Sequence, residues 1–199
     1  MSTALLSAYN KHPDLISFTQ SLRALDWDIL ASAGTAKYLN GQGVSVRDVA
    51  ELVRLPAPGH KDVLSSEIQA ALLAGDSLED RAELARTGVP RIDLVYVNLY
   101  PLAEEVGNPN CTLESVIKKT DINSLMLLLL AAQGRRFVIC SREQISEILD
   151  YLMEQLQSPK PPDEHERFIS SLVWRAEVTV ARYCRVSADW HYSYAEAHR

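Results

Sequence analysis

The sequence predicts an α/β fold built on a mostly parallel sheet, and three observations support this class. The chain has 199 residues, of which 47% are hydrophobic and 23% charged, values that suit one soluble domain with a substantial core. Its first forty residues alternate short apolar runs with amphipathic segments, an order typical of parallel strands joined by crossover helices. Residues 92–101 (IDLVYVNLYP) form an apolar, β-branched run, as expected for a buried strand.

The first forty residues contain two predicted strands and two predicted helices. Residues 4–8 are a short apolar run typical of a strand. Asp14 can cap a helix with one apolar face, made of Leu15, Phe18, Leu22 and Leu25. Residues 28–31 return to strand character, and residues 32–35 turn into a second helix.

The middle of the chain contains the segment that locates a ligand site. The segments before it are a short strand or helix at 44–53, a Pro/Gly-rich loop at 55–60, a helix at 65–73 and a charged, exposed stretch at 78–86. The strand at residues 92–101 then ends with Asn98 and Tyr100, which place an amide and a phenol at its carboxyl end. Ligands of open α/β sheets bind just outside that end, so we expect a site there.

The second half is predicted to be mainly helical. Its predicted elements are a helix at 112–119, a polar hinge at 121–124, a helix at 125–132, a strand at 136–140, a helix from 145, a linker at 158–163 and a helix at 165–187. Residues 125–132 (LMLLLLAA) are too short to span a bilayer and indicate a buried helix.

Two features of the second half predict local detail. Ser141 and Gln144 match a capping box before a helix whose apolar face consists of Ile145, Ile148, Leu149, Leu152, Met153 and Leu156. Residues 190–199 form an aromatic, polar tail, which we expect to pack on the domain or to become ordered against a partner.

Charge and cysteine content restrict the partners and the compartment. The net charge is −6, whereas a general nucleic-acid binder is more often basic. A small anion can still bind at a helix N-terminus of an acidic protein. Cys111, Cys140 and Cys184 are widely spaced, which suggests reduced thiols, and they match no zinc pattern. The first residues lack the pattern of a signal peptide, so we expect a cytoplasmic protein. From the charge, the cysteine spacing and the absence of a long apolar stretch we expect no nucleic-acid, metal or membrane partner.

Several motifs in order carry a resemblance to a known family. They are ALLS at 4–7 followed by Lys11, SAGTAK at 32–37, IDLV and VNLYP within 92–101, TLE at 112–114 followed by Asp121-Ile122, and RFISSLVWRAEVTVARY at 167–183. Together they resemble the IMP cyclohydrolase domain of the bifunctional purine-biosynthesis enzyme, which has the methylglyoxal synthase-like fold. The resemblance implies a three-layer α/β/α domain at residues 1–157. Residues 158–199 would then form a linker, a helix and a tail that pack on it.

The resemblance also implies a reaction. In this family a carboxamide nitrogen attacks a formyl carbon and water leaves, which turns 5-formamidoimidazole-4-carboxamide ribotide into IMP. The reaction is intramolecular, so holding the substrate in the attack conformation supplies much of the acceleration. The resemblance implies a phosphorylated imidazole or purine ribotide as ligand, no cofactor, and a homodimer with sites near its interface.

Site residues follow from the resemblance position by position. It implies Tyr100 and Asp121 as catalytic residues, and Lys61 as a third if its loop shifts. The substrate-binding residues that it implies are Ser7, Lys11, Ser32, Gly34, Thr35, Lys37, Asn98, Ile122 and Asn123. Two family lysines are replaced, by Asp62 and Gln133, and a carboxylate in place of a lysine reverses the charge beside an anionic ligand.

These replacements leave three functions open. The first is a cyclohydrolase-like enzyme that acts on the family substrate or on a related nucleotide analogue, for instance in a nucleoside-analogue pathway. The second is a catalytically inactive purine-ribotide-binding or regulatory module, and the third, with the weaker resemblance, is methylglyoxal synthase. Asp121 also suits a helix N-cap, and Asn98 a polar cap at a strand end.

Overall fold

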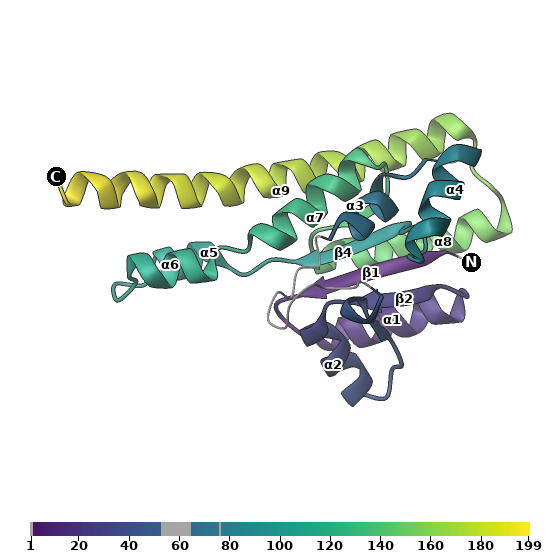
Figure 1. Cartoon of the computed structure of the whole chain (residues 1–199), viewed down its shortest axis with the longest axis horizontal. Coiled ribbons are helices and arrows are strands. Elements are labelled where there is room, and N and C mark those ends of the chain that lie inside the picture. The colour runs from purple at the N-terminus through teal and green to yellow at the C-terminus, as the bar shows by residue number, and fades with distance from the viewer. Residues whose placement is uncertain (1, 53–64, 76) are drawn as a thin grey trace.

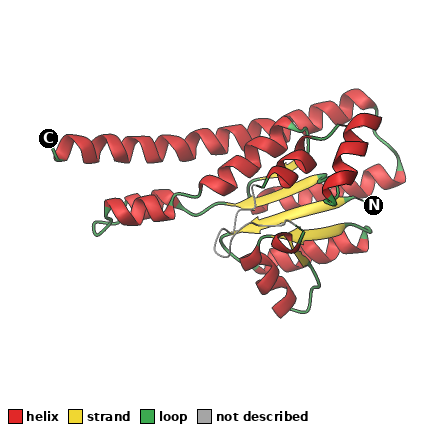
Figure 2. Cartoon of the chain, viewed as in Figure 1, coloured by secondary structure: helices red, strands yellow, loops and turns green. Residues whose placement is uncertain are grey.

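The described residues form a five-stranded parallel sheet at the centre of the protein. The computed structural model describes residues 2–52, 65–75 and 77–199. The strands are β1 (Thr3–Ala8), β2 (Asp28–Ala31), β3 (Arg47–Asp48), β4 (Leu94–Asn98) and β5 (Phe137–Ile139). They pair in the order β3-β2-β1-β4-β5, and every pairing among them is parallel (Figure 2). The predicted α/β class and parallel sheet are confirmed.

The strand order creates a switch point between β1 and β4. The chain moves outward from β1 to β2 and β3, and then returns to place β4 and β5 on the other side of β1. In register, Leu5 lies between Leu30 of β2 and Val95 of β4. Crossover connections therefore diverge at the carboxyl ends of β1 and β4, where this topology forms a ligand crevice.

Helices cover both faces of the sheet (Figure 1). One face carries α1 (Pro13–Ala24), α2 (Ala33–Gly41) and α8 (Ile145–Gln157). The other carries α3 (Ser66–Leu73), α4 (Leu78–Thr87), α7 (Ile122–Gln133) and α9 (Pro162–Ala197). Side chains alternate along β1, so Leu5 joins one core and Leu6 the other, and both are fully buried. This arrangement gives the predicted three layers.

Two short helices and half of a long one extend beyond the carboxyl ends of the strands. α5 (Leu102–Val106) and α6 (Leu113–Lys119) follow β4, and α5 packs against α9. α9 has 36 residues, about 54 Å at the usual helical rise. Figure 1 shows its distal half projecting past the sheet on the same side as α5 and α6.

Two helix starts differ from the prediction. Asp14 does not cap α1; His12 is the N-cap, because Pro13 fits the first helical position, where a fixed φ and a missing N–H cost nothing. The predicted hinge at 121–124 is also wrong, since Asp121 is the N-cap of α7 and the helix begins at Ile122.

The predicted helices 125–132 and 145–156 are confirmed in their main features. α7 buries Leu125, Leu127, Leu128 and Leu130, and the capping box of Ser141 and Gln144 is present, although it opens a short 3₁₀ turn before α8. Two members of the predicted apolar face of α8 are wrong as core residues, because Met153 is 44% and Leu156 70% exposed.

The carboxyl-terminal segment is more helical than predicted. α9 begins at Pro162, inside the predicted linker, and continues through Ala197, so residues 190–199 do not form a separate tail. Trp190, Tyr194 and His198 stack in succession at four-residue spacing, with ring centroids 5.3 and 4.1 Å apart. Side-chain pairs at this spacing support the end of the helix. Within residues 2–52, 65–75 and 77–199, no helix is long and apolar enough to cross a membrane.

Candidate ligand site at the carboxyl edge of the sheet

The loops after β1 and β4 are joined directly at the switch point. The Tyr9 amide donates to the backbone oxygen of Asn98 at 2.9 Å, and the Asn10 amide donates to the side-chain oxygen of Asn98 at 2.8 Å. Asn98 therefore acts as the polar cap that its position at the strand end suggested. This contact uses its carboxamide oxygen, and the carboxamide N–H₂ group is the part that can face a ligand.

The start of α2 forms one side of the site. Thr35 is fully buried, and its Oγ1 accepts from the Ala8 amide at 3.0 Å and from the Ser32 hydroxyl at 3.0 Å. Ser32 is the N-cap but its side chain makes no cap bond. Its backbone oxygen accepts from the Thr35 amide at 2.8 Å, so the amide of Gly34 is the first-turn donor that can meet a ligand. Open space surrounds the position where a Cβ of Gly34 would lie. A helix start of this kind favours an anion.

Lys11 places a cation next to this helix start. Its Nζ donates to the backbone oxygens of Ala8 at 2.9 Å and Tyr9 at 3.0 Å. An ammonium group has three N–H donors, so one remains for a ligand. Partial burial lowers the pKa of Lys11 from its ordinary value. Of the other residues expected on this side, Ser7 is half-buried on β1 and Lys37 is exposed on α2.

Tyr100 forms the opposite side of the site. Its ring packs edge-on against Tyr9, with centroids 4.6 Å apart, so the phenol stands next to the end of β1. Its hydroxyl donates to Oε2 of Glu105 at 3.3 Å, and Nζ of Lys119 lies 5.7 Å from the ring centroid. The motifs pointed to Tyr100, whereas Glu105 and Lys119 were missed.

Glu105 is a buried carboxylate with three donors around it. Its side chain is 6% exposed, and it accepts from Lys119 Nζ at 2.5 Å, from Ser115 Oγ at 2.6 Å and from Tyr100. The hydrogen bond from Lys119, followed by that from Ser115, lowers the pKa of Glu105. The same bond to Glu105 raises the pKa of Lys119. No short-range pattern reveals this cluster, because it joins α5 to the end of α6.

Asp121 serves as the N-cap of α7. Its Oδ1 accepts from the Ser124 amide at 3.2 Å, and its own amide donates to the Tyr183 hydroxyl at 3.0 Å. One carboxylate oxygen is therefore committed to the helix start. Ile122 and Asn123 are exposed in the first turn of the same helix.

The two positions at which family lysines are replaced lie in different parts of the chain. Lys61 and Asp62 lie outside the described residues. Gln133 is exposed at the end of α7, where the chain turns back to enter β5 at Phe137. Because β5 is parallel to β4, this end lies at the amino edge of the sheet, away from Asn98. Within one chain, Gln133 and Tyr100 are at opposite edges.

The amino edge contains a cavity of its own. It has a volume of about 400 Å³ and is lined by Trp27, Phe137 and Arg135, among others. Arg135 is engaged by Glu166 and by the Ser170 hydroxyl, the latter at 2.8 Å. This cavity is far from the switch point and does not belong to the site described above. In the described ranges there is no group of three or more His, Cys, Asp or Glu residues that could hold a metal ion.

Comparisons with known proteins agree with this architecture. A family model described as the MGS-like domain matches residues 14–126. The bifunctional purine biosynthesis protein PurH of Neisseria gonorrhoeae is 36% identical over 138 residues, and that of Acidithiobacillus ferrooxidans is 35% identical over 137 residues. These alignments cover 68% and 67% of this chain but 26% of each relative, so the chain spans about a quarter of their length.

A solved structure is similar along almost the whole chain. The structure titled "Crystal structure of ForH" superposes with a TM-score of 0.75 at 24% identity, covering 96% of this chain and 98% of that one. At this identity the similarity concerns the fold alone. The family model, the parallel sheet and the relatives lead to one conclusion: the chain belongs to the MGS-like domain family.

Proposed function

We propose that the protein is an IMP cyclohydrolase-like enzyme that closes a ring on a formamidoimidazole carboxamide ribotide or on a related nucleotide analogue. The main support is the geometry at the switch point. Thr35 ties the anion-favouring start of α2 to the end of β1, and Tyr9 at that end packs against Tyr100. A helix start suited to phosphate and a phenol suited to proton transfer therefore both adjoin the carboxyl end of β1.

The phosphate of the ligand would lie at the start of α2. Ser32 supplies a hydroxyl, Gly34 supplies a first-turn amide without a Cβ, and Lys11 supplies a positive charge, while the buried Thr35 holds the turn against β1. Ser7 and Lys37 would complete this side, since they lie on the same two elements. Helix-end amides and one cation together are the usual means of holding a phosphate in an otherwise acidic protein.

The base of the ligand would lie against Tyr100 and Asn98. Ring closure requires the carboxamide nitrogen and the formyl carbon to be held in contact, and then a proton to be moved as water leaves. Tyr100, whose hydroxyl donates to Glu105, would take part in that proton transfer. The amide of Asn98 can orient the carboxamide, and Asp121, Ile122 and Asn123 would border the base from the start of α7.

A second candidate function is a purine-ribotide-binding module without catalysis. One observation favours it: Asp121, implied as catalytic, already uses a carboxylate oxygen to cap α7. The replacement of a family lysine by Asp62 agrees with this alternative. In this case the phosphate side of the site would still bind a nucleotide.

A turnover assay separates the two functions. The formamido ribotide is incubated with the protein, and formation of IMP is followed by ultraviolet absorbance, with Tyr100→Phe as the matched variant. Turnover that falls in the variant supports the enzyme. Absence of turnover at micromolar protein, together with a thermal shift on adding IMP, supports the module, and methylglyoxal formed from dihydroxyacetone phosphate would overturn both.

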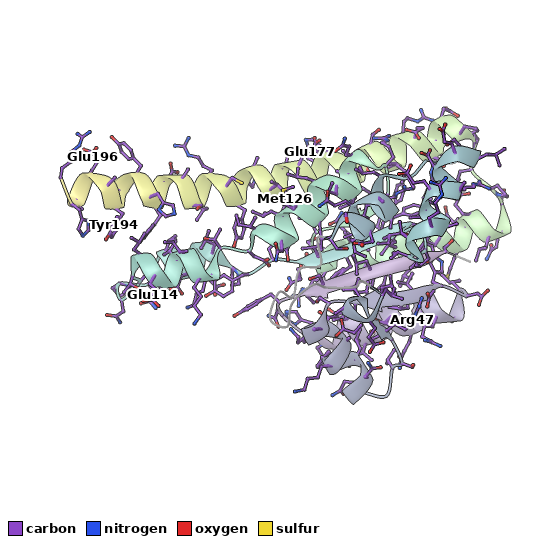
Figure 3. All side chains as sticks on the ribbon, viewed as in Figure 1. Arg47, Glu114, Met126, Glu177, Tyr194 and Glu196 are labelled. Carbon is purple, nitrogen blue, oxygen red and sulfur yellow. The ribbon has the colours of Figure 1, made fainter. Side chains whose placement is uncertain are left out.

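We also propose that the protein forms a homodimer. Ile122, Met126 and Leu129 lie on one face of α7 at helical spacing, and they are 57%, 41% and 38% exposed. Figure 3 shows Met126 on α7, and Tyr194 and Glu196 on the part of α9 that stands clear of the sheet. A second copy would cover the face of α7.

Sedimentation analysis tests the dimer. Wild type should have the mass of two chains, and Met126→Glu should shift the measured mass toward that of one chain. A monomeric wild type contradicts the proposal.

A further inference from the structure

The buried cluster around Glu105 joins the base side of the site to an ion pair. Three donors converge on one carboxylate: Lys119 Nζ at 2.5 Å, Ser115 Oγ at 2.6 Å and Tyr100 Oη at 3.3 Å. A buried carboxylate stays ionised when donors and a cation surround it, as they do here. The hydrogen bond from Tyr100 is the longest of the three, and bonds of catalytic groups tend to shorten when substrate binds.

The cluster has an open side. The side chain of Lys119 is 43% exposed, and its ammonium lies above the Tyr100 ring as well as against Glu105. Tyr100 in turn contacts Tyr9 at the end of β1. A purely structural ion pair between α5 and α6 would not require the phenol of the candidate site as its third member.

Besides Tyr9 at the end of β1, titratable groups near the cluster come from α7 and α9. Tyr183 on α9 accepts from the Asp121 amide at 3.0 Å and donates to the backbone oxygen of Lys119 at 3.4 Å. Asp121 caps α7 next to it. Of the described cations and acids, Lys119 is the one that contacts the Glu105 carboxylate directly.

We propose that Tyr100, Glu105 and Lys119 form a proton relay, in which Lys119 on α6 supplies the cation that holds the Glu105 carboxylate beside the Tyr100 hydroxyl. This inference rests on the proposed function. Lys119 acts through Glu105 and Tyr100 and is a positioning residue. Glu105 exchanges a proton with the substrate through the Tyr100 hydroxyl.

The relay returns to its starting protonation state after each reaction. As the carboxamide nitrogen bonds to the formyl carbon, the C=O π pair moves onto the formyl oxygen. The nitrogen gives one proton to Tyr100 Oη, whose own proton passes to Glu105. The proton returns along the same path to the formyl oxygen. That oxygen then leaves as water with a second proton from the formamide nitrogen, and the C=N bond of the new ring forms.

Kinetics of matched variants test the relay. The variants are Glu105→Gln, Lys119→Met and Lys119→Arg, with Lys118→Met as control, because Lys118 is the exposed neighbour on α6. We expect Glu105→Gln to lower kcat by about 10²-fold with little change in KM, the usual size of an acid–base contribution. Lys119→Met should lower kcat and move the acid limb of the kcat profile to higher pH, since the pKa of Glu105 rises without its cation. Lys119→Arg should restore the profile.

A titration that does not depend on turnover keeps the two proposals separate. The Glu105 carboxyl is followed by ¹³C NMR, assigned by its loss in Glu105→Gln, with and without IMP. If wild type converts the ribotide but Lys119→Met behaves like Lys118→Met, the relay is overturned and the proposed function stands. If wild type converts nothing, the function fails. A change of the Glu105 signal on adding IMP that disappears in Tyr100→Phe then supports the coupling, and an unchanged signal overturns it.

Discussion

The two sides of the candidate site are assembled in different ways. On the phosphate side, Ser32, Gly34 and Thr35 lie within four residues, and one turn sets their relative positions. On the base side, Tyr100 follows β4, Glu105 lies on α5 and Lys119 ends α6. The first arrangement is local in the sequence, whereas the second exists only after α5 and α6 have packed.

This difference has a chemical consequence. The phosphate side uses backbone amides and hydroxyls, which depend on the turn and tolerate changes elsewhere. The base side uses side-chain charges, and a charge can be supplied from a different element if its head group reaches the same place. Such a site can keep its phosphate subsite and still change the groups that act on the base.

The largest expected effect is on the base side, at Tyr100. We expect Tyr100→Phe to lower kcat by roughly 10²-fold or more, because it removes the hydroxyl that links the substrate to Glu105. The thermal midpoint should change little, since the ring contact with Tyr9 is kept. Steady-state kinetics with the formamido ribotide measure the effect, and Tyr9→Phe is the matched control. Equal activity of the two variants would contradict a distinct role for Tyr100.

The next effect is on the phosphate side, at Thr35. Thr35→Val keeps the shape of the side chain but leaves the buried Ala8 amide without its acceptor. An unsatisfied buried donor costs about 1–3 kcal/mol of the free energy of unfolding. Urea unfolding followed by circular dichroism measures this cost, and Thr35→Ser, which retains the oxygen, should stay near wild type. A Val variant as stable as the Ser variant would show that the contact is not needed.

The order and type of most elements could be predicted from the sequence, and the reason is visible in particular residues. β-branched runs marked β4, and the small residues 32–35 marked the start of α2, because both signals are local. The start of α1 was wrong because Pro13 took the first helical position ahead of Asp14. At α7 the expected hinge was wrong, whereas the alternative role of Asp121 as a helix N-cap is confirmed.

The candidate site residues show the same contrast between signals that are local in the sequence and contacts that form only on folding. The residues that could be named from motifs lie at or within a few residues of a strand end: Ser32, Gly34, Thr35, Asn98 and Tyr100. Glu105 and Lys119 are fourteen residues apart on two different helices, and each looks like an ordinary surface charge in the sequence. Gln133 could not be placed either, because only the parallel pairing of β5 shows that α7 carries it to the other edge.

A smaller effect should follow from Lys11 on the phosphate side. Lys11→Met should weaken binding of a phosphorylated ligand about tenfold, with less effect on the corresponding nucleoside, because the ammonium is a point charge for the phosphate. Burial lowers the pKa of Lys11, so its ammonium loses its proton at a lower pH than an ordinary lysine does. As pH rises, the affinity of wild type should therefore begin to fall before pH reaches the ordinary lysine pKa of 10.5. Calorimetric titration against pH measures both, with Lys37→Met as comparison. A loss equal for nucleotide and nucleoside would argue against a phosphate contact.

The smallest expected effect concerns the stability that Glu105 contributes. Its pKa is lowered in the folded state, first by the hydrogen bond from Lys119, so its contribution is present above the pKa of an unfolded glutamate, about 4.3. The contribution is lost as pH falls through the lower folded value. Wild type should therefore exceed Glu105→Gln in stability most at neutral pH, and the difference should shrink below about pH 4. Denaturant melts between pH 3 and 7 test this, with the exposed neighbour Glu104→Gln as control. If the difference in unfolding free energy is constant with pH, Glu105 contributes through packing and not through its charge. The ion pair between Lys119 and Glu105 would then not stabilise the base side.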